Sequence, residues 1–264
     1  MTGNNTRIFF VGGLISFRAL FNWIKPTLYI PTMLGSTVFQ IVFFVYLGRY
    51  ARTGQNDAFF IVGNAVQVCG MSSVYGMTMA VANERQFGTL GPLLATPANR
   101  MAIFLGRGLP VLVNGLLVSA TGFLFGIAVL HFRPATSTLP ALVFVVVVTT
   151  LSCTAFGMLL GSIGLYGKDY FFVANLAYYL LLLFCGVNVP LDDLPGWMAA
   201  IGRCLPLTHG IAAARKVAAG SSLRGVSGLV WTELGVAAAY ALAGFMLFRF
   251  LEGASRRSAL LDTF

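Results

Sequence analysis

Residues 108–132 read GLPVLVNGLLVSATGFLFGIAVLHF, a run without Asp, Glu, Lys or Arg that lies between Arg107 and Arg133. About 20 apolar residues in a helix cross the ~30 Å hydrocarbon layer of a bilayer. A helix also satisfies its own backbone hydrogen bonds there, where no water can do so. The run therefore predicts a transmembrane helix, and similar runs recur along the chain.

The composition agrees with a membrane protein. Of the 264 residues, 58% are hydrophobic and only 9% are charged, whereas soluble domains carry about 25% charged residues. The net charge of +9 resides in Lys and Arg between the apolar runs, where such residues set topology and contact anionic lipid. Membrane lipids are thus expected partners, and nucleic acid is not.

We predict an all-α membrane protein of a single domain, residues 1–264, with six transmembrane helices. The charge-poor runs place these helices at residues 27–47, 58–82, 108–130, 139–166, 170–189 and 226–249.

The first 25 residues have a different pattern. Arg18, Asn22 and Lys25 form one polar stripe at helical spacing, and apolar residues fill the other side. This favours a helix that lies in the membrane interface over residues 1–25. The alternative is a frayed start to the first span.

The distribution of Lys and Arg favours cytoplasmic N- and C-termini, because cytoplasmic loops are enriched in these residues. On that topology residues 190–224 lie on the outer side. They contain Pro190, Pro195 and Pro206 between apolar stretches too short to cross a bilayer. Short re-entrant helices before the last span are therefore expected.

No catalytic or metal-binding pattern is present in the sequence. The two histidines, His131 and His209, fall in separate loops, and no GxxxxGKS/T motif for ATP is found. We therefore expect no cofactor in this chain. If transport is driven by ATP, the ATPase must be a separate chain.

Polar and aromatic residues recur at helical spacing in the second and fifth spans. This set forms the candidate translocation path: Phe60, Asn64, Gln67, Met71, Tyr75, Phe171, Asn175 and Tyr179. The same side chains could instead make hydrogen bonds between helices, and the sequence does not decide between the two.

Glu233 is the acid that interrupts the last apolar run. Spans one to five have no ionisable residue at their centres, which argues against proton- or sodium-coupled transport. Glu233 could act as a gate or contact a substrate. An acid that reaches the outer interface is the favoured interpretation.

Two segments resemble signatures of a known family. Residues 84–90 read ERQFGTL, followed by LLATP at 93–97 and by Arg100; residues 186–190 read GVNVP, followed by LPGW at 194–197 and PLTH at 206–209. Their order and spacing resemble the ABC-2 (type V, ABCG-like) exporter permeases, in the bacterial drug and polysaccharide export branch. Gly91 stands where that family usually has an acidic residue, which weakens one expected contact.

This resemblance implies an ATP-driven exporter of the bacterial plasma membrane. Two permease chains, identical or homologous, would pair above two ABC ATPase subunits that bind ATP and Mg²⁺. Residues 84–97 would form a cytoplasmic coupling helix; the alternative is an ordinary basic loop. The coupling residues implied are Glu84, Arg85, Gly88, Thr89, Leu93 and Pro97, and the outer gate region comprises Asn188, Pro190 and Glu233.

Three kinds of function stay open. Export of a hydrophobic or amphipathic small molecule, drug-like or antibiotic-like, is preferred on resemblance to short bacterial drug-export permeases. Lipid-linked polysaccharide or glycolipid is an alternative cargo for the same fold. A channel or membrane scaffold without ATP coupling is an alternative from another class.

Overall fold

The computed structural model describes residues 30–86, 100–164 and 170–258. Within these ranges the regular structure is helical. Its α-helices are α3 (Ser36–Tyr50), α4 (Asp57–Gln86), α6 (Arg100–Ala128), α7 (Leu139–Gly164), α8 (Tyr170–Phe184), α9 (Gly196–Cys204), α10 (Thr208–Ala218) and α11 (Ser227–Ser258). The predicted interfacial helix at 1–25 lies outside the described residues.

Among the described residues, five helical segments are long and apolar enough to cross a membrane. They are Pro31–Tyr50, Asp57–Val81, Gly106–Ala128, Thr136–Gly164 and Leu223–Leu247. Their bounds agree within a few residues with five of the six predicted spans, because each predicted apolar run is long enough to cross the bilayer as a helix. The chain is therefore a multi-pass α-helical membrane protein.

The predicted fifth span, residues 170–189, is only partly helical. Helix α8 ends at Phe184, and Gly186 follows with a φ of +71°, a conformation that a helix cannot contain. Fifteen helical residues extend about 22 Å, which is less than the ~30 Å hydrocarbon thickness. A sixth crossing at this position stays a prediction.

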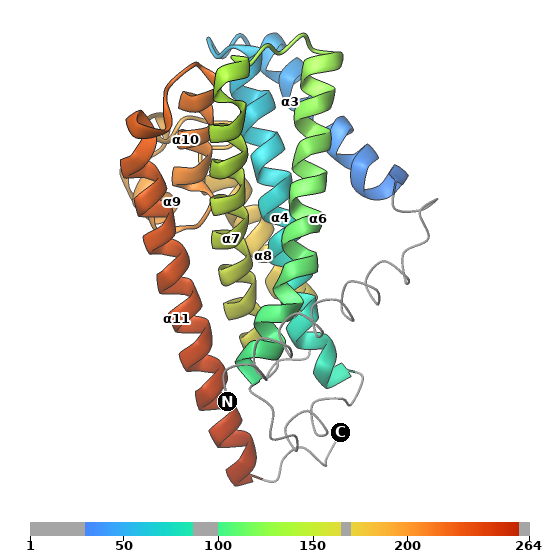
Figure 1. Ribbon diagram of the computed structural model, residues 1–264, viewed down its shortest axis with the longest axis vertical. Coiled ribbons are helices and arrows are strands. Elements are labelled where there is room, and N and C mark those ends of the chain that lie inside the picture. Colours follow the sequence, from blue (N-terminus) through green and yellow to red (C-terminus); the bar gives the residue numbers. More distant parts are fainter. Residues whose placement is uncertain (1–29, 87–99, 165–169, 259–264) are drawn as a thin grey trace.

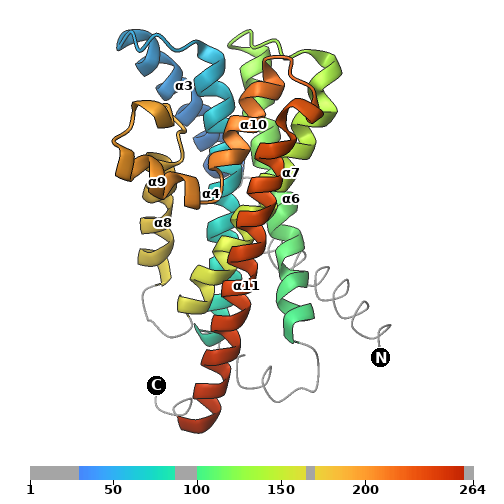
Figure 2. The same ribbon diagram turned by 90° about the vertical axis from the view of Figure 1, so that its left-hand side faces the viewer.

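The segment between α8 and α11 contains the two short helices α9 and α10, where short broken helices were expected. Helix α10 packs against α4, α7 and α11 and buries Ile211, Ala214 and Val217. Helix α10 lies at one end of the bundle, where residues 51–56 and 129–135 connect neighbouring helices (Figures 1 and 2). We call this end the loop end. The depth of α9 and α10 in a membrane stays a prediction.

Helices α4 and α7 form the centre of the bundle, with α6 and α11 packed beside them (Figure 1). Two glycines of α7, Gly157 and Gly161, allow the close approach. A Cβ at Gly157 would lie 2.8 Å from the Val74 carbonyl oxygen, and one at Gly161 would lie 2.7 Å from the Val81 Cβ. This GxxxG motif is thus a helix-packing element.

Gly157→Ala is expected to lower the thermal midpoint of the purified protein by about 5 °C, because overpacking a helix contact costs about 1–3 kcal/mol. Gly235→Ala is the matched control, since no atom of the described residues lies within 4 Å of a Cβ placed there. Thermal unfolding in detergent measures both variants. Equal midpoints would contradict the close α4–α7 packing.

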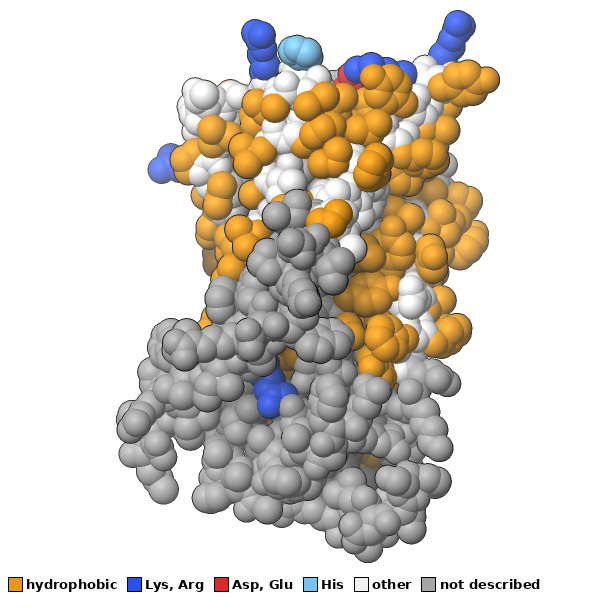
Figure 3. Space-filling view, turned by 90° about the vertical axis from the view of Figure 1, so that its right-hand side faces the viewer, with side chains coloured by type: hydrophobic (Ala, Val, Ile, Leu, Met, Phe, Trp, Pro, Cys, Tyr) orange, Lys and Arg blue, Asp and Glu red, His pale blue; other side chains and the backbone are white. Residues whose placement is uncertain are grey.

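The surface fits a protein that is surrounded by lipid. Figure 3 shows hydrophobic side chains over the body of one face. Most of the visible charged and His side chains lie near the loop end, and one Lys or Arg side chain lies lower on this face. The large hydrophobic side chains that are exposed include Phe39 and Phe43 on α3 and Leu124 on α6. Such a surface cannot be hydrated at low cost, which supports the membrane assignment.

Candidate functional site

The polar residues in the first half of α4 make hydrogen bonds between helices. The Gln40 side chain of α3 donates from Nε2 to Asn64 Oδ1 at 3.0 Å and to Gln67 Oε1 at 2.7 Å. Asn64 and Gln67 are fully buried. For these two residues, therefore, the structure confirms the interhelical hydrogen bonds that the sequence left open.

This amide cluster reaches the turn after α8. Asn64 Nδ2 donates to Asn188 Oδ1 at 2.8 Å and to the Phe60 carbonyl oxygen at 2.9 Å. The chain around Asn188 and Pro190 belongs to the predicted outer gate region. The cluster thus ties that region to α3 and α4.

The second half of the α4 stripe faces α8 and is more open. Tyr75 donates its hydroxyl hydrogen to Asn175 Oδ1 at 2.6 Å, and Asn175 Nδ2 donates to the Phe171 carbonyl oxygen. Asn175, Phe171 and Tyr179 are exposed, and Met71 is partly exposed. The candidate path residues therefore divide into a buried set near the loop end, which includes Phe60, and an exposed set shared by α4 and α8.

Glu233 is not at a water-facing interface, so the favoured interpretation of this residue was wrong. It is buried, and its carboxylate accepts the backbone N–H of Leu207 at 2.9 Å and that of Gly210 at 3.1 Å. These groups belong to the start of α10, where a helix favours a negative charge. Leu207 has a φ of 87°, rarely adopted by non-glycine residues, and Glu233 stabilises it there.

Glu233→Gln is expected to lower the thermal midpoint by about 4 °C, because an amide replaces one carboxylate oxygen and loses one of two charge-assisted bonds. Asp192→Asn is the matched control, since Asp192 is an exposed carboxylate in the segment between α8 and α11. Thermal unfolding of both variants gives the comparison. An unchanged midpoint for Glu233→Gln would show that its carboxylate does not hold α10.

Arg215 of α10 also enters the bundle. It donates to the carbonyl oxygens of Phe59, Gly186 and Val187, at 2.6 to 3.3 Å, and its guanidinium lies over the Phe59 ring at 3.5 Å. Burial lowers the pKa of Arg215 to about 9, which keeps it protonated at neutral pH. We call this arrangement the Arg215 clamp; it joins α10, the start of α4 and the turn after α8.

Sequence reasoning singled out neither Gln40 nor Arg215, which was counted only among the Lys and Arg residues between apolar runs. Gln40 is the single amide among the apolar residues 38–47, and that isolation was a usable signal. Arg215 had no such signal, because its three carbonyl partners lie far away in the sequence. Gly63 leaves room for the clamp: a Cβ there would meet the guanidinium at 2.5 Å.

The predicted coupling residues are only partly described. Helix α4 continues to Gln86, so Glu84 and Arg85 belong to the last turn of a transmembrane helix rather than to the start of a separate one. Gly88, Thr89, Leu93 and Pro97 lie outside the described residues. Within the described ranges, no group of three or more His, Cys, Asp or Glu could hold a metal ion.

Comparison with known proteins identifies relatives. Residues 13–218 match the family model described as "ABC-2 type transporter". The chain is 25% identical over 192 residues to the "Probable multidrug ABC transporter permease YbhR" of Escherichia coli, covering 72% of this chain and 52% of that protein. It is 26% identical over 244 residues to the "Probable doxorubicin resistance ABC transporter permease protein DrrC" of Mycobacterium tuberculosis, covering 87% of this chain and 85% of that protein. The chain thus spans about half the length of the first relative.

Proposed function

Because the chain belongs to the ABC-2 type transporter family, whose membrane permeases lack the ATPase domain, we propose that it is the permease subunit of an ATP-driven exporter. The family match over residues 13–218 is the observation that carries this proposal. A separate ABC ATPase supplies ATP and Mg²⁺ binding. The protein resides in the bacterial plasma membrane with both termini in the cytoplasm, so the loop end faces outward.

The proposed cargo is a hydrophobic or amphipathic small molecule. Two relatives bear names that refer to multidrug transport and doxorubicin resistance, which supports a drug-like substrate. The exposed face of α4 and α8 supports the same class, because Asn175, Tyr75 and Tyr179 offer hydrogen bonds and aromatic surface without a charge. This face is the proposed path.

The path is incomplete in one chain. Phe171 and Tyr179 are 50% and 61% exposed on α8, although they flank the hydrogen-bonded Tyr75–Asn175 pair. Polar side chains at membrane depth favour a protein or water-lined partner over lipid. A second permease chain, identical or homologous, therefore covers this face, and the path runs between the two.

Helix α4 transmits the ATP-driven motion in this proposal. The last turn of α4 contains Glu84 and Arg85. In its first turns, the Phe59 carbonyl oxygen accepts a hydrogen bond from Arg215, and the Asn64 side chain donates one to Asn188. One continuous helix thus joins the proposed ATPase-facing end to the turn at Asn188 and Pro190. Displacement of the coupling segment by the ATPase would move this turn as part of one rigid element.

Asn175→Leu is expected to reduce export of doxorubicin about two- to tenfold, which corresponds to the loss of one hydrogen bond of about 0.5–1.5 kcal/mol. Efflux from cells that express the chain with its ATPase, followed by drug fluorescence, measures this. Thr232→Leu is the control, because Thr232 is an exposed polar residue of α11 away from this face. An equal reduction of export in Asn175→Leu and Thr232→Leu would argue against a path along α4 and α8.

A further inference from the structure

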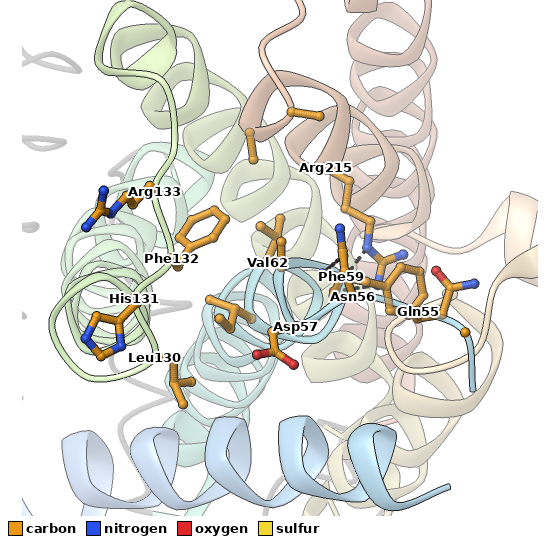
Figure 4. A pocket seen from close by; sticks show the side chains of 15 residues that line it. Gln55, Asn56, Asp57, Phe59, Val62, Leu130, His131, Phe132, Arg133 and Arg215 are labelled. Carbon is orange, nitrogen blue, oxygen red and sulfur yellow. Dashed lines mark hydrogen bonds between the residues drawn. The ribbon is translucent and has the colours of Figure 1, made fainter. Parts of the chain in front are cut away.

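A cavity of about 840 Å³ lies at the loop end of the bundle, away from the proposed path. It is bounded by the start of α4, the connection between α6 and α7, and the end of α10 (Figure 4). Small-molecule sites in proteins typically measure about 300–1,000 Å³. The cavity is thus large enough for a ligand and has no role in the export route proposed above.

The cavity has an apolar wall. Phe59 and Val62 contribute from α4, and Leu130 and Phe132 contribute from the opposite connection. In Figure 4, Val62 and Phe132 lie between the Arg133 and Arg215 side chains. Such a wall favours a ligand that has an apolar body.

Two cations line the same cavity. Arg215 and Arg133 lie on opposite sides in Figure 4, where the exposed Arg133 side chain extends away from Arg215. The lining acid Asp57 is already paired with Arg49, the one ion pair found among the described residues. The lining therefore carries two cations against one acid whose charge is compensated elsewhere.

Arg215 has no carboxylate partner within the described part of the chain. Its bonds go to three neutral carbonyl groups and use four of its five N–H groups. Carbonyl oxygens satisfy the donors but do not neutralise the charge, and a partly buried charge without a counterion attracts an anion strongly.

We propose that this cavity binds an amphiphile with an anionic headgroup, a phosphate or carboxylate attracted by Arg215 and by the exposed Arg133 at the rim, and with its acyl chain along the apolar wall, chiefly against the partly exposed Phe59 and Leu130. Two cations select the charge, and the apolar wall selects the chain. Neither feature alone would distinguish such a ligand from a free anion or from a neutral lipid.

The test uses the purified full-length chain in nanodiscs of neutral phosphatidylcholine, without an ATPase. Fluorescent lysophosphatidic acid is titrated, with protein-free nanodiscs subtracted, and monoacylglycerol with the same labelled chain serves as the uncharged probe. The acid should bind saturably and at least roughly tenfold more tightly than the glycerol, and Arg133→Glu should weaken the acid roughly tenfold. Lys216→Glu makes the same change of charge at an exposed residue outside the lining, and it should leave binding unchanged.

Equal binding of the two probes would overturn the proposal, as would equal effects of Arg133→Glu and Lys216→Glu. Displacement of the acid by millimolar inorganic phosphate would also overturn it, because it would identify a free-anion site. The absence of an ATPase keeps this result separate from the proposed export function, which these outcomes neither support nor weaken.

Discussion

Arg215→Met is expected to lower the thermal midpoint of the purified protein by about 10 °C, because the free energy of unfolding falls by about 3 kcal/mol. This is the largest stability effect of any substitution considered. The methionine fills much of the space but leaves the carbonyl groups of Phe59, Gly186 and Val187 without their donor. A buried acceptor without a donor costs about 1–3 kcal/mol. Thermal unfolding monitored by size-exclusion chromatography measures the change.

Two further variants make this test specific. Lys216→Met changes the neighbouring, exposed cation of α10 and should shift the midpoint by less than about 2 °C. Arg215→Lys keeps the charge but cannot reproduce the planar fork that reaches three carbonyl groups, so its midpoint should fall between the other two. A wild-type midpoint for Arg215→Met would contradict the clamp.

Glu84→Ala or Arg85→Ala is expected to reduce export roughly tenfold or more while the partner ATPase still hydrolyses ATP, because each removes charge-assisted bonds of about 1.5–3 kcal/mol at the proposed contact. Both residues lie in the last turn of α4, at the start of the predicted coupling segment. Transport and ATP hydrolysis are measured in the same reconstituted vesicles.

Arg249→Ala provides the control for this experiment, because Arg249 is an exposed cation on α11 outside the coupling segment. It should leave the ratio of transport to hydrolysis unchanged. Wild-type ratios in both Glu84→Ala and Arg85→Ala would rule out a coupling role for this turn.

The spans could be predicted because their signal is local. A charge-free run bounded by Arg107 and Arg133 needs no distant partner to become a membrane helix, and α6 and α7 appear where such runs predicted them. The family was also predictable, because its two signatures are short and contiguous. The match over residues 13–218 confirms it.

The site could be predicted only in part, because its geometry depends on distant partners. The stripe from Phe60 to Tyr75 was visible, yet periodicity alone could not show that Asn64 and Gln67 bond Gln40 whereas Tyr75 bonds Asn175. Glu233 was misjudged for the same reason: its carboxylate serves backbone groups of α10, which the sequence does not place beside it.

The end of α8 shows a second limit. The apolar run continued past Phe184, and composition alone therefore extended the span toward residue 189. The helix stops because Gly186 adopts a φ of +71°, and the following turn is held by the Arg215 clamp and by Asn64. Hydropathy reports which residues avoid water, not where tertiary bonds end a helix.

Transport in reconstituted vesicles tests the proposed function most directly. Vesicles contain the chain alone, the chain with its proposed partner ABC ATPase, or the chain with that ATPase inactivated at its P-loop lysine. Doxorubicin movement, followed by fluorescence, should require ATP together with the chain and the active ATPase. Equal movement by the chain alone, without nucleotide, would contradict its assignment as the permease of an ATP-driven exporter.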